Sequence, residues 1–399
     1  GLIPALCPGL IPVLRPGLTS ALFLLVAIVA LCGCGPKEPP PEEPSVAFVV
    51  YDAGETLGLL PVAHRLRGRE VEVNWIPLTP WSADLLTANG EDYVALPSGV
   101  GEMTHLEDRE AEAEVGYWED ALAVDPPDLL VSGLVSAAQA QLGRWCQAFG
   151  IRSRGFHDGF QPPEPGSMAA RTASAFDELW VPTTRVREGF FTLGVPAVLA
   201  GQPTLEAWRR TSLEVDVAEV RRRLGIDDDY RILLFAGQYG SGYRETLTAF
   251  LEAMGPILST DSSLYLVVSH HPRTDGEVER GALARAGLPR ATLAPEGVPT
   301  MELAVGAEVV LTWTSTVGVQ AAFMGKPVVY YSPPAEFDAH LVEEGVARLA
   351  DEGTLAAVLA RVLRENPDAE AMREILLRAG YVVNADSVVA ELILAAIPG

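Results

Sequence analysis

Several short segments of the sequence carry residues that could act on a ligand, and each follows a stretch typical of a β-strand. One is His157-Asp158, directly after residues 152–156. An imidazole next to a carboxylate could work as a general acid and base, or hold the hydroxyl groups of a sugar. Adjacent strand residues point to opposite faces, so Asp158 need not orient His157.

A second segment, residues 52–58, reads Asp-Ala-Gly-Glu-Thr-Leu-Gly and leads into a predicted helix. Gly54 and Gly58 would let the backbone come close to a ligand. Glu55 could act as a base or bind a hydroxyl group. A tight turn with a helix cap explains the same residues without a ligand, and both interpretations stay open.

A glycine-rich loop, residues 237–242, lies between a predicted strand and a predicted helix, and its amides could hold a phosphate or a ring. The spacing of its glycines is not that of the dinucleotide fingerprint. The candidate binding residues in this loop are Gly237, Gln238, Ser241 and Gly242.

The next predicted strand ends in Ser-His-His-Pro-Arg at residues 269–273. Arg273 could bind a phosphate with two parallel hydrogen bonds. His270 and His271 have no further metal ligand at a recognisable spacing, so we expect no zinc site here and no metal elsewhere.

The segment 312–318 runs from a strand into hydroxyl residues that precede a helix. Thr314, Ser315 and Thr316 could bind an anion together with the free amides of the helix, and Gly318 would permit a close approach. The alternative is that the three hydroxyl residues serve as helix caps only.

The elements that position these segments alternate between short β-branched runs and longer helical stretches, the pattern of parallel α/β sheets. Such sheets bind ligands outside the carboxyl ends of their strands. Strands are predicted at 46–51, 71–76, 128–132, 152–156 and 178–181, and then at 231–236, 264–269, 308–312 and 327–331. We therefore predict two doubly wound Rossmann-like domains, residues 46–205 and 206–399, the second ending in three helices.

The composition limits the possible partners. The 399 residues hold 29 Lys and Arg against 53 Asp and Glu, a formal charge of −24, which argues against a nucleic-acid ligand. Hydrophobic residues make up 48% of the chain, enough for sizeable cores. Cys146 is the one cysteine after residue 34, so no disulfide framework is expected.

The first 45 residues resemble an export and anchoring segment. An apolar run at 18–33 is shorter than the ~20 residues of a membrane span, and it ends in Leu-Cys-Gly-Cys. Residues 1–34 thus resemble a bacterial lipoprotein signal with Cys34 as the lipidated residue, and residues 35–45 form a Pro/Glu-rich tether. An uncleaved anchor is the alternative.

The body of the chain resembles the GT-B glycosyltransferase superfamily, nearest the CDP-glycerol glycerophosphotransferase, UDP-N-acetylglucosamine 2-epimerase and capsular or Kdo transferase groups. The motifs that carry this resemblance are Glu-Leu-Trp-Val-Pro at 178–182, Gly-Gln-Pro at 201–203, the loop 237–242, His-Pro-Arg at 271–273, Thr-Ser-Thr-Val-Gly at 314–318 and Met-Gly-Lys-Pro-Val-Val at 324–329.

This resemblance implies a cleft between two domains, with a nucleotide-activated donor as substrate and no separate cofactor. It places the loop 237–242 and His271 near the nucleotide, and the 315–318 turn near its phosphates. It implies Glu55, His157 and Asp158 as catalytic candidates on the acceptor side. Many relatives carry an acidic residue on the helix after that turn to bind the ribose, and Gln320 is the nearest residue here.

The expected function is transfer of a glycosyl or glycerophosphate group to an envelope polysaccharide or teichoic-acid-like acceptor. A lipid anchor would place the protein on the periplasmic face of a membrane, and a misassigned leader would place it on the cytoplasmic face. The alternative is a tethered binding protein without activity, which uses the cleft to hold a glycan or another small solute.

Overall fold

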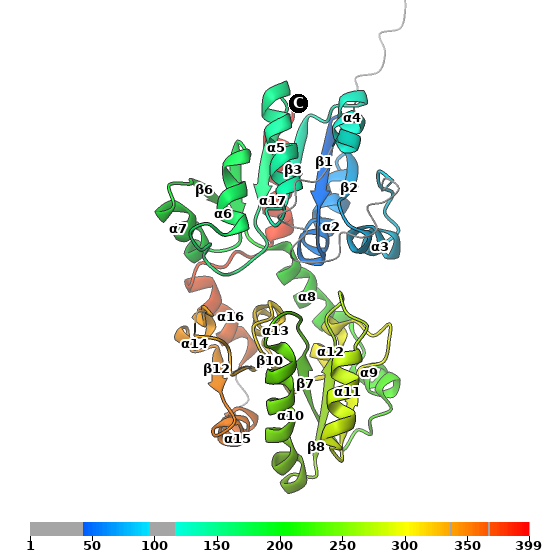
Figure 1. The fold of residues 1–399 in the computed structure, drawn as a ribbon, viewed down its shortest axis with the longest axis vertical. Helices are drawn as coiled ribbons and strands as arrows, with labels where there is room; N and C mark the ends of the chain where they lie inside the picture. The colour runs from blue at the N-terminus through cyan, green and yellow to red at the C-terminus, as the bar shows by residue number, and fades with distance from the viewer. Residues whose placement is uncertain (1–42, 96–115, 336, 366–367, 399) are drawn as a thin grey trace, which may run out of the picture. The chain divides into compact units, whose positions relative to one another are not determined.

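The strands of the first half form one parallel sheet (Figure 1). The computed structural model describes residues 43–95, 116–335, 337–365 and 368–398. Within them this sheet has six strands in the order β2-β1-β3-β4-β5-β6. The strands are β1 (Ser45–Val50), β2 (Glu72–Pro77), β3 (Leu129–Ser132), β4 (Arg152–Phe156), β5 (Glu178–Val181) and β6 (Ala197–Leu199). Residues 46–50 are all buried, as expected for a strand covered on both faces.

Helices cover both faces of this sheet and bring the loops at its carboxyl edge together. Its helices are α2 (Ala53–Arg67), α3 (Pro80–Ala88), α4 (Gly116–Val124), α5 (Ala137–Phe149), α6 (Met168–Thr172), the 3-10 turn η3 (Ala173–Ala175) and α7 (Thr184–Thr192). One core packs α2 against the sheet, and a second packs α4, α5 and α7 on the opposite face. Capping side chains fix where α2 and α5 begin, namely Asp52 and Ser136.

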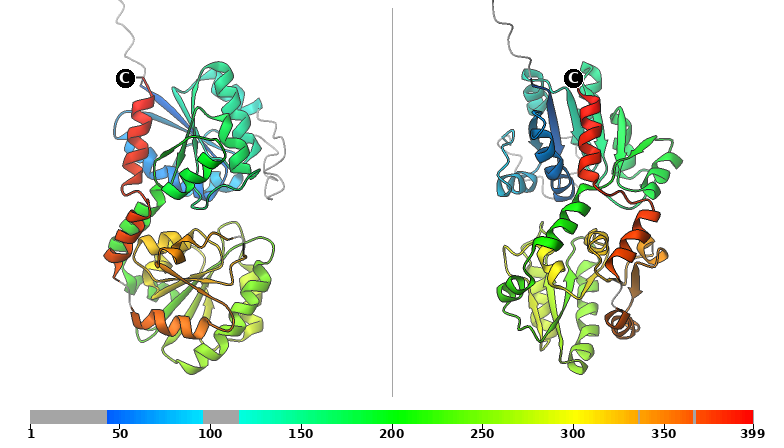
Figure 2. Two further views of the ribbon diagram at one scale, coloured as in Figure 1. Left: turned by 90° about the vertical axis from the view of Figure 1, so that its left-hand side faces the viewer. Right: turned by 180° about the vertical axis from the view of Figure 1, so that it is seen from behind.

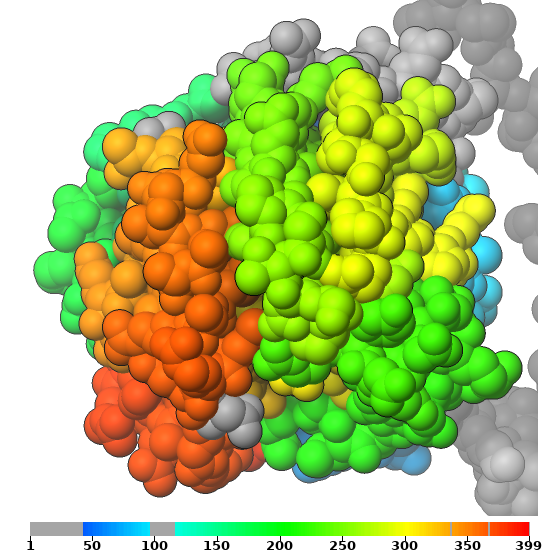
Figure 3. All heavy atoms as spheres, turned by 90° about the horizontal axis from the view of Figure 1, so that it is seen from below, coloured from blue at the N-terminus to red at the C-terminus, as the bar shows by residue number. Residues whose placement is uncertain are grey.

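The second half forms another parallel sheet, with the order β12-β11-β10-β7-β8-β9 among the described residues. The strands are β7 (Arg231–Ala236), β8 (Leu264–Ser269), β9 (Ala291–Leu293), β10 (Val309–Thr312), β11 (Val328–Tyr331) and β12 (Ala347–Ala350). The helices are α9 (Val217–Leu224), α10 (Tyr243–Thr260), α11 (Glu277–Ala286), α12 (Thr300–Gly306), α13 (Val317–Phe323), α14 (His340–Glu343), α15 (Leu355–Glu365) and α16 (Ala369–Arg378). Figure 3 shows α15, α10 and α11 side by side, in orange, green and yellow.

Two segments cross between the sheets. Helix α8 (Pro203–Glu214) leads from the first sheet to the second, and the last helix, α17 (Ala385–Ala396), returns to pack against α2 and α8 (Figure 2). Val389 and Ile393 belong to the same hydrophobic core as Leu59 of α2. The sequence predicts that residues 206–399 form one domain, whereas the structure packs α17 on the first sheet.

The predicted signal at 1–34, Cys34 and most of the tether lie outside the described residues. Among the residues that the structure describes, no helix has both the length and the apolar character needed to span a membrane.

Candidate active site

Glu55 joins two loops at the carboxyl edge of the first sheet. Its carboxylate accepts hydrogen bonds from the backbone N–H of Tyr51 (2.8 Å) and of Leu134 (3.1 Å), and from Nε2 of Gln139 (2.7 Å). A Cβ at Gly133 would lie 1.6 Å from its Oε1, so a glycine there leaves room for the carboxylate. Glu55 is completely buried and ties the β1–α2 turn to the β3–α5 turn.

Burial raises the pKa of Glu55 well above its ordinary value, and the charges of Asp52 and Asp158 raise it further. The sequence leaves open whether Glu55 acts as a base, binds a hydroxyl group or belongs to a turn without a ligand. The geometry instead gives it a positioning role, because its oxygens are held by the protein's own donors.

Asp52 and Asp158 meet at the start of α2. Asp52 caps the helix, and its Oδ1 accepts from the backbone N–H of Gly54 (3.1 Å) and of Glu55 (3.3 Å). A Cβ at Gly54 would lie only 1.9 Å from Oδ2 of Asp158. The close approach that the sequence predicts for Gly54 is therefore to this carboxylate of the same chain. With Glu55, three carboxylates gather at one edge of the sheet.

His157 is buried beside this cluster. Its ring meets Phe190 edge to face at 5.2 Å, and neither ring nitrogen has a hydrogen-bond partner within the described part of the chain. Burial lowers the pKa of His157 to about 4, so the imidazole is neutral near pH 7. A Cβ at Gly159 would lie 3.2 Å from its Nε2. The neutral ring therefore packs against Gly159 and leaves no room there for a larger side chain.

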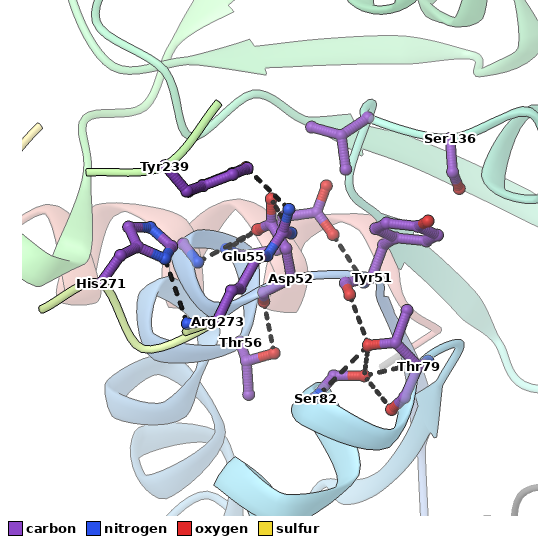
Figure 4. A network of polar contacts seen from close by, with 12 residues as sticks. Tyr51, Asp52, Glu55, Thr56, Thr79, Ser82, Ser136, Tyr239, His271 and Arg273 are labelled. Atoms are coloured by element: carbon purple, nitrogen blue, oxygen red, sulfur yellow. Dashed lines mark hydrogen bonds and ion pairs between the residues drawn. The ribbon is translucent and has the colours of Figure 1, made fainter. Parts of the chain in front are cut away.

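Arg273 reaches from the second sheet to this acidic cluster (Figure 4). Its Nη2 lies 3.1 Å from Oδ2 of Asp52, and its Nη1 donates to the hydroxyl of Tyr239 at 2.7 Å. The guanidinium carbon is 5.0 Å from the ring centroid of Trp81 and 5.3 Å from that of Tyr239. Arg273 therefore binds a carboxylate of this chain, where the sequence predicts a phosphate.

His271 supports this arginine. Its Nδ1 accepts from the backbone N–H of Arg273 at 3.1 Å, and its ring lies 4.4 Å from that of Tyr239. The sequence reasoning missed the aromatic neighbours Trp81 and Tyr239. Tyr239 lies within the glycine-rich loop, so its position in the sequence could have indicated a role at the site. Trp81 comes from the distant helix α3, and nothing in the sequence indicates that it lies near Arg273.

The glycine-rich loop packs closely on its own sheet. A Cβ at Gly237 would lie 2.2 Å from the carbonyl oxygen of Ser269, so this glycine is required for packing. Nε2 of Gln238 donates to Oγ1 of Thr314 at 2.9 Å and links the loop to the next candidate segment. Ser241 is exposed, and Gly242, the N-cap residue before α10, has a φ of 83°.

The hydroxyl segment before α13 is held mainly by local hydrogen bonds. The backbone N–H of Ser315 donates to Oγ1 of Thr312, and Oγ of Ser315 accepts from the backbone N–H of Val317, both at 3.2 Å. A Cβ at Gly318 would lie 2.7 Å from the hydroxyl oxygen of Tyr330, so the close approach that the sequence predicts is again within the chain. Oγ of Ser315 thus satisfies one amide at the helix start, whereas Thr316, the N-cap residue of α13, makes no side-chain capping hydrogen bond.

Gln320 is directed to the connection between the sheets. Its Nε2 donates to Oγ1 of Thr204 in α8 at 3.3 Å. The amide group of Gln320 therefore bonds to a residue of the protein itself.

A pocket of about 410 Å³ brings two of the predicted segments together. One wall is formed by residues that come directly after His157-Asp158 in the sequence. The other wall is formed by the hydroxyl segment and by the connection after β11. The lining residues are Gly159, Phe160, Gln161, Glu164, Thr314, Thr316, Pro334 and Phe337. Thr314 and Thr316 therefore face the same space as Gly159 and Phe160, whereas Asp158 is not among the lining residues.

Metal and thiol chemistry gain no support from the described residues. No group of three or more His, Cys, Asp or Glu side chains among them could hold a metal ion. Burial raises the pKa of the Cys146 thiol to about 12, so this cysteine is a packing residue in α5 rather than a nucleophile.

Comparisons with known proteins agree with this fold. Residues 226–339 match the family described as Capsule polysaccharide biosynthesis protein. A lipid-A-disaccharide synthase of Alcanivorax borkumensis is 28% identical over 137 residues, which span 34% of this chain and 34% of that protein.

Two solved structures extend the likeness over most of the chain. The UDP-GlcNAc 2-epimerase from Neisseria meningitidis, bound to UDP-GlcNAc, superposes with a TM-score of 0.70 at 14% identity, covering 88% of this chain and all of that one. A glycosyltransferase from Rickettsia africae gives a TM-score of 0.62 at 10% identity, covering 88% and 98%. The chain therefore has the GT-B-type fold of two parallel α/β domains that these enzymes share.

Proposed function

We propose that this protein is a glycosyltransferase-type enzyme that moves a glycosyl or glycerophosphate group from a nucleotide-activated donor to a cell-envelope acceptor. The observation that carries the proposal is the pocket shared by Thr314 and Thr316 with the turn that follows Asp158. A transfer reaction needs a donor site close to an acidic or basic group, and this pocket is lined by Thr314, Thr316 and the residues that directly follow Asp158, which itself lies behind the lining.

In this proposal the residues divide the work between the two sheets. The hydroxyl groups of Thr314 and Thr316 hold the donor through its diphosphate or the transferred group. Asp158 takes the proton of the acceptor hydroxyl as it attacks the activated carbon or phosphorus. Glu55 positions the acidic cluster, and the neutral His157 supports the turn that carries Asp158. The match to a capsule polysaccharide family favours a polysaccharide acceptor.

The first test is binding. Thermal-shift measurements with UDP, CDP, GDP and CMP, with and without their sugars or glycerol, should give a shift with one base, since a ligand of the folded state raises its stability. Thr316→Ala should reduce the shift. The matched control is Ser259→Ala, which removes an exposed hydroxyl group on α10 that donates to the carbonyl oxygen of Gly255. This substitution should leave the thermal shift unchanged.

The second test is turnover. Asp158→Asn should lower the rate of donor consumption by about 100-fold while nucleotide binding persists, because general-base catalysis contributes on that order. A cooperatively melting sample that binds none of these nucleotides would contradict the proposal.

A second candidate is a binding protein that holds a glycan without turnover. It is favoured by Gln320, whose amide is bonded to Thr204 and brings no carboxylate to a ribose. Binding of a sugar nucleotide with no consumption in the presence of envelope acceptors would support this candidate over the enzyme.

We also propose that Cys34 carries a lipid and that residues 35–45 tether the body to a membrane. Mass spectrometry of the mature protein should find a diacylglycerol adduct on Cys34 that Cys34→Ala abolishes. An unmodified Cys34 in the native host would contradict this proposal.

A further inference from the structure

The apolar walls of the pocket are packed against aromatic rings of the protein itself. Phe160 stacks on Tyr381 with ring centroids 5.9 Å apart, and Phe337 lies against Tyr330 at 5.0 Å. Pro334 adds a third apolar surface. Fixed aromatic and proline surfaces of this kind suit the C–H face of a pyranose ring.

The polar groups of the pocket suit hydroxyl groups. Thr314 and Thr316 offer hydroxyls, Gln161 an amide and Glu164 a carboxylate. Oγ1 of Thr314 is oriented by the hydrogen bond that it accepts from Gln238. Hydroxyl, amide and carboxylate groups together can accept from and donate to several hydroxyls of one ring.

The charge of the pocket is negative. Among the described residues that line it, none is Lys, Arg or His, and the one acidic residue is Glu164, whose side chain is exposed at the rim. Arg185 and Arg273 are bound to carboxylates of the chain. Both Nε and Nη2 of Arg185 donate to Asp338 at 2.8 Å, and Arg273 pairs with Asp52. A sugar carboxylate would therefore meet a repelling charge and no cationic partner.

We infer that this pocket takes an uncharged, hydroxyl-rich pyranose and excludes sugar acids, with Glu164 as the residue that sets the preference. The inference rests on the proposed function, since it concerns the group that the donor brings to the pocket. It names the substrate class as neutral hexosyl donors rather than uronic or keto-deoxy acid donors.

The experiment uses pairs of donors that differ only at C6. Isothermal titration of the full chain with UDP-glucose and UDP-glucuronate, or with GDP-mannose and GDP-mannuronate if GDP is the base that binds, should show the acid binding at least 10-fold more weakly. Glu164→Gln should reduce this ratio to about twofold by weakening the repulsion, and Glu164→Lys should reverse it. The matched control is Glu296→Gln, which changes an exposed glutamate outside the pocket. It should leave the ratio of the two donor affinities unchanged.

The outcomes separate this inference from the proposed function. Equal affinity for both members of a pair, or a preference for the acid, overturns the inference and leaves the nucleotide site standing. The same holds if UDP or GDP binds but neither sugar adds affinity. If neither the nucleotides nor their sugars bind, the proposed function fails and the inference fails with it.

Discussion

Arg273 and Asp52 form an ion pair that joins the two sheets, with Nη2 of the arginine 3.1 Å from Oδ2 of the aspartate. The arginine follows β8, and the aspartate caps α2 after β1. Both side chains are largely removed from solvent, with exposed fractions of 9% and 16%. The carboxyl edges of the two sheets are therefore linked by a pair that water screens only in part.

Removal of one partner of this pair should be costly. We expect Arg273→Ala to lower the free energy of unfolding by about 3 kcal/mol, because the largely buried carboxyl group of Asp52 loses its ion pair with the arginine. A double-mutant cycle of Asp52→Asn with Arg273→Gln, measured by urea denaturation, should give a coupling energy above about 1 kcal/mol. The exposed pair of Arg69 and Glu391, with exposed fractions of 64% and 62%, is the control and should show almost no coupling.

Gly133 should tolerate no side chain. A Cβ there would overlap the carboxylate of Glu55, so we expect Gly133→Ala to destabilise the protein by about 3 kcal/mol. Gly116→Ala is the control, since no atom of the described residues meets its Cβ position within 4 Å. A shift in the urea midpoint for both variants alike would refute the packing argument.

His157 should make stability depend on pH. Burial lowers its pKa to about 4 in the folded state, so the folded protein favours the neutral ring. The unfolded chain takes up the proton more readily as the pH falls below 6.5. The free energy of unfolding is therefore highest above pH 6.5 and decreases between about pH 6.5 and 4. Between pH 7.5 and pH 5.5, the free energy of unfolding of the wild type should therefore decrease by about 1 kcal/mol more than that of His157→Leu. Equal losses in urea titrations of the two proteins would show that the ring is not held neutral by burial.

Gly318 should act on stability rather than on ligand affinity. We expect Gly318→Ala to cost about 2 kcal/mol, because its Cβ would meet the hydroxyl of Tyr330. Tyr330→Phe removes that oxygen and should restore part of the loss in the double variant. If Gly318→Ala instead weakened nucleotide binding with an unchanged melting temperature, the glycine would face a ligand.

The strands that the sequence predicts are the interior strands of both sheets and one edge strand, β2. The other three edge strands, β6, β9 and β12, were missed. A strand covered on both faces is a continuous apolar run, which stands out in a sequence. The three missed strands have three or four residues each, and none of the residues of β6 and β9 is fully buried.

The location of the candidate site followed from the rule that ligands bind at the carboxyl ends of parallel strands. The roles of single residues were less predictable, because they depend on contacts between distant segments. Gly54 and Gly318 leave room for Asp158 and Tyr330, partners 104 and 12 residues away in the chain, and a sequence does not distinguish such contacts from the approach of a ligand. Trp81 was missed for the same reason.

The return of α17 to the first sheet makes the second sheet an insertion within the first domain. Residues 46–205 alone would expose Leu59 and the other core residues that α17 covers, so a fragment ending at residue 205 should aggregate unless residues 385–398 are supplied. It also means that two separate stretches of backbone connect the halves, one through α8 and one before α17. Any movement of one half against the other therefore has to bend both stretches at once.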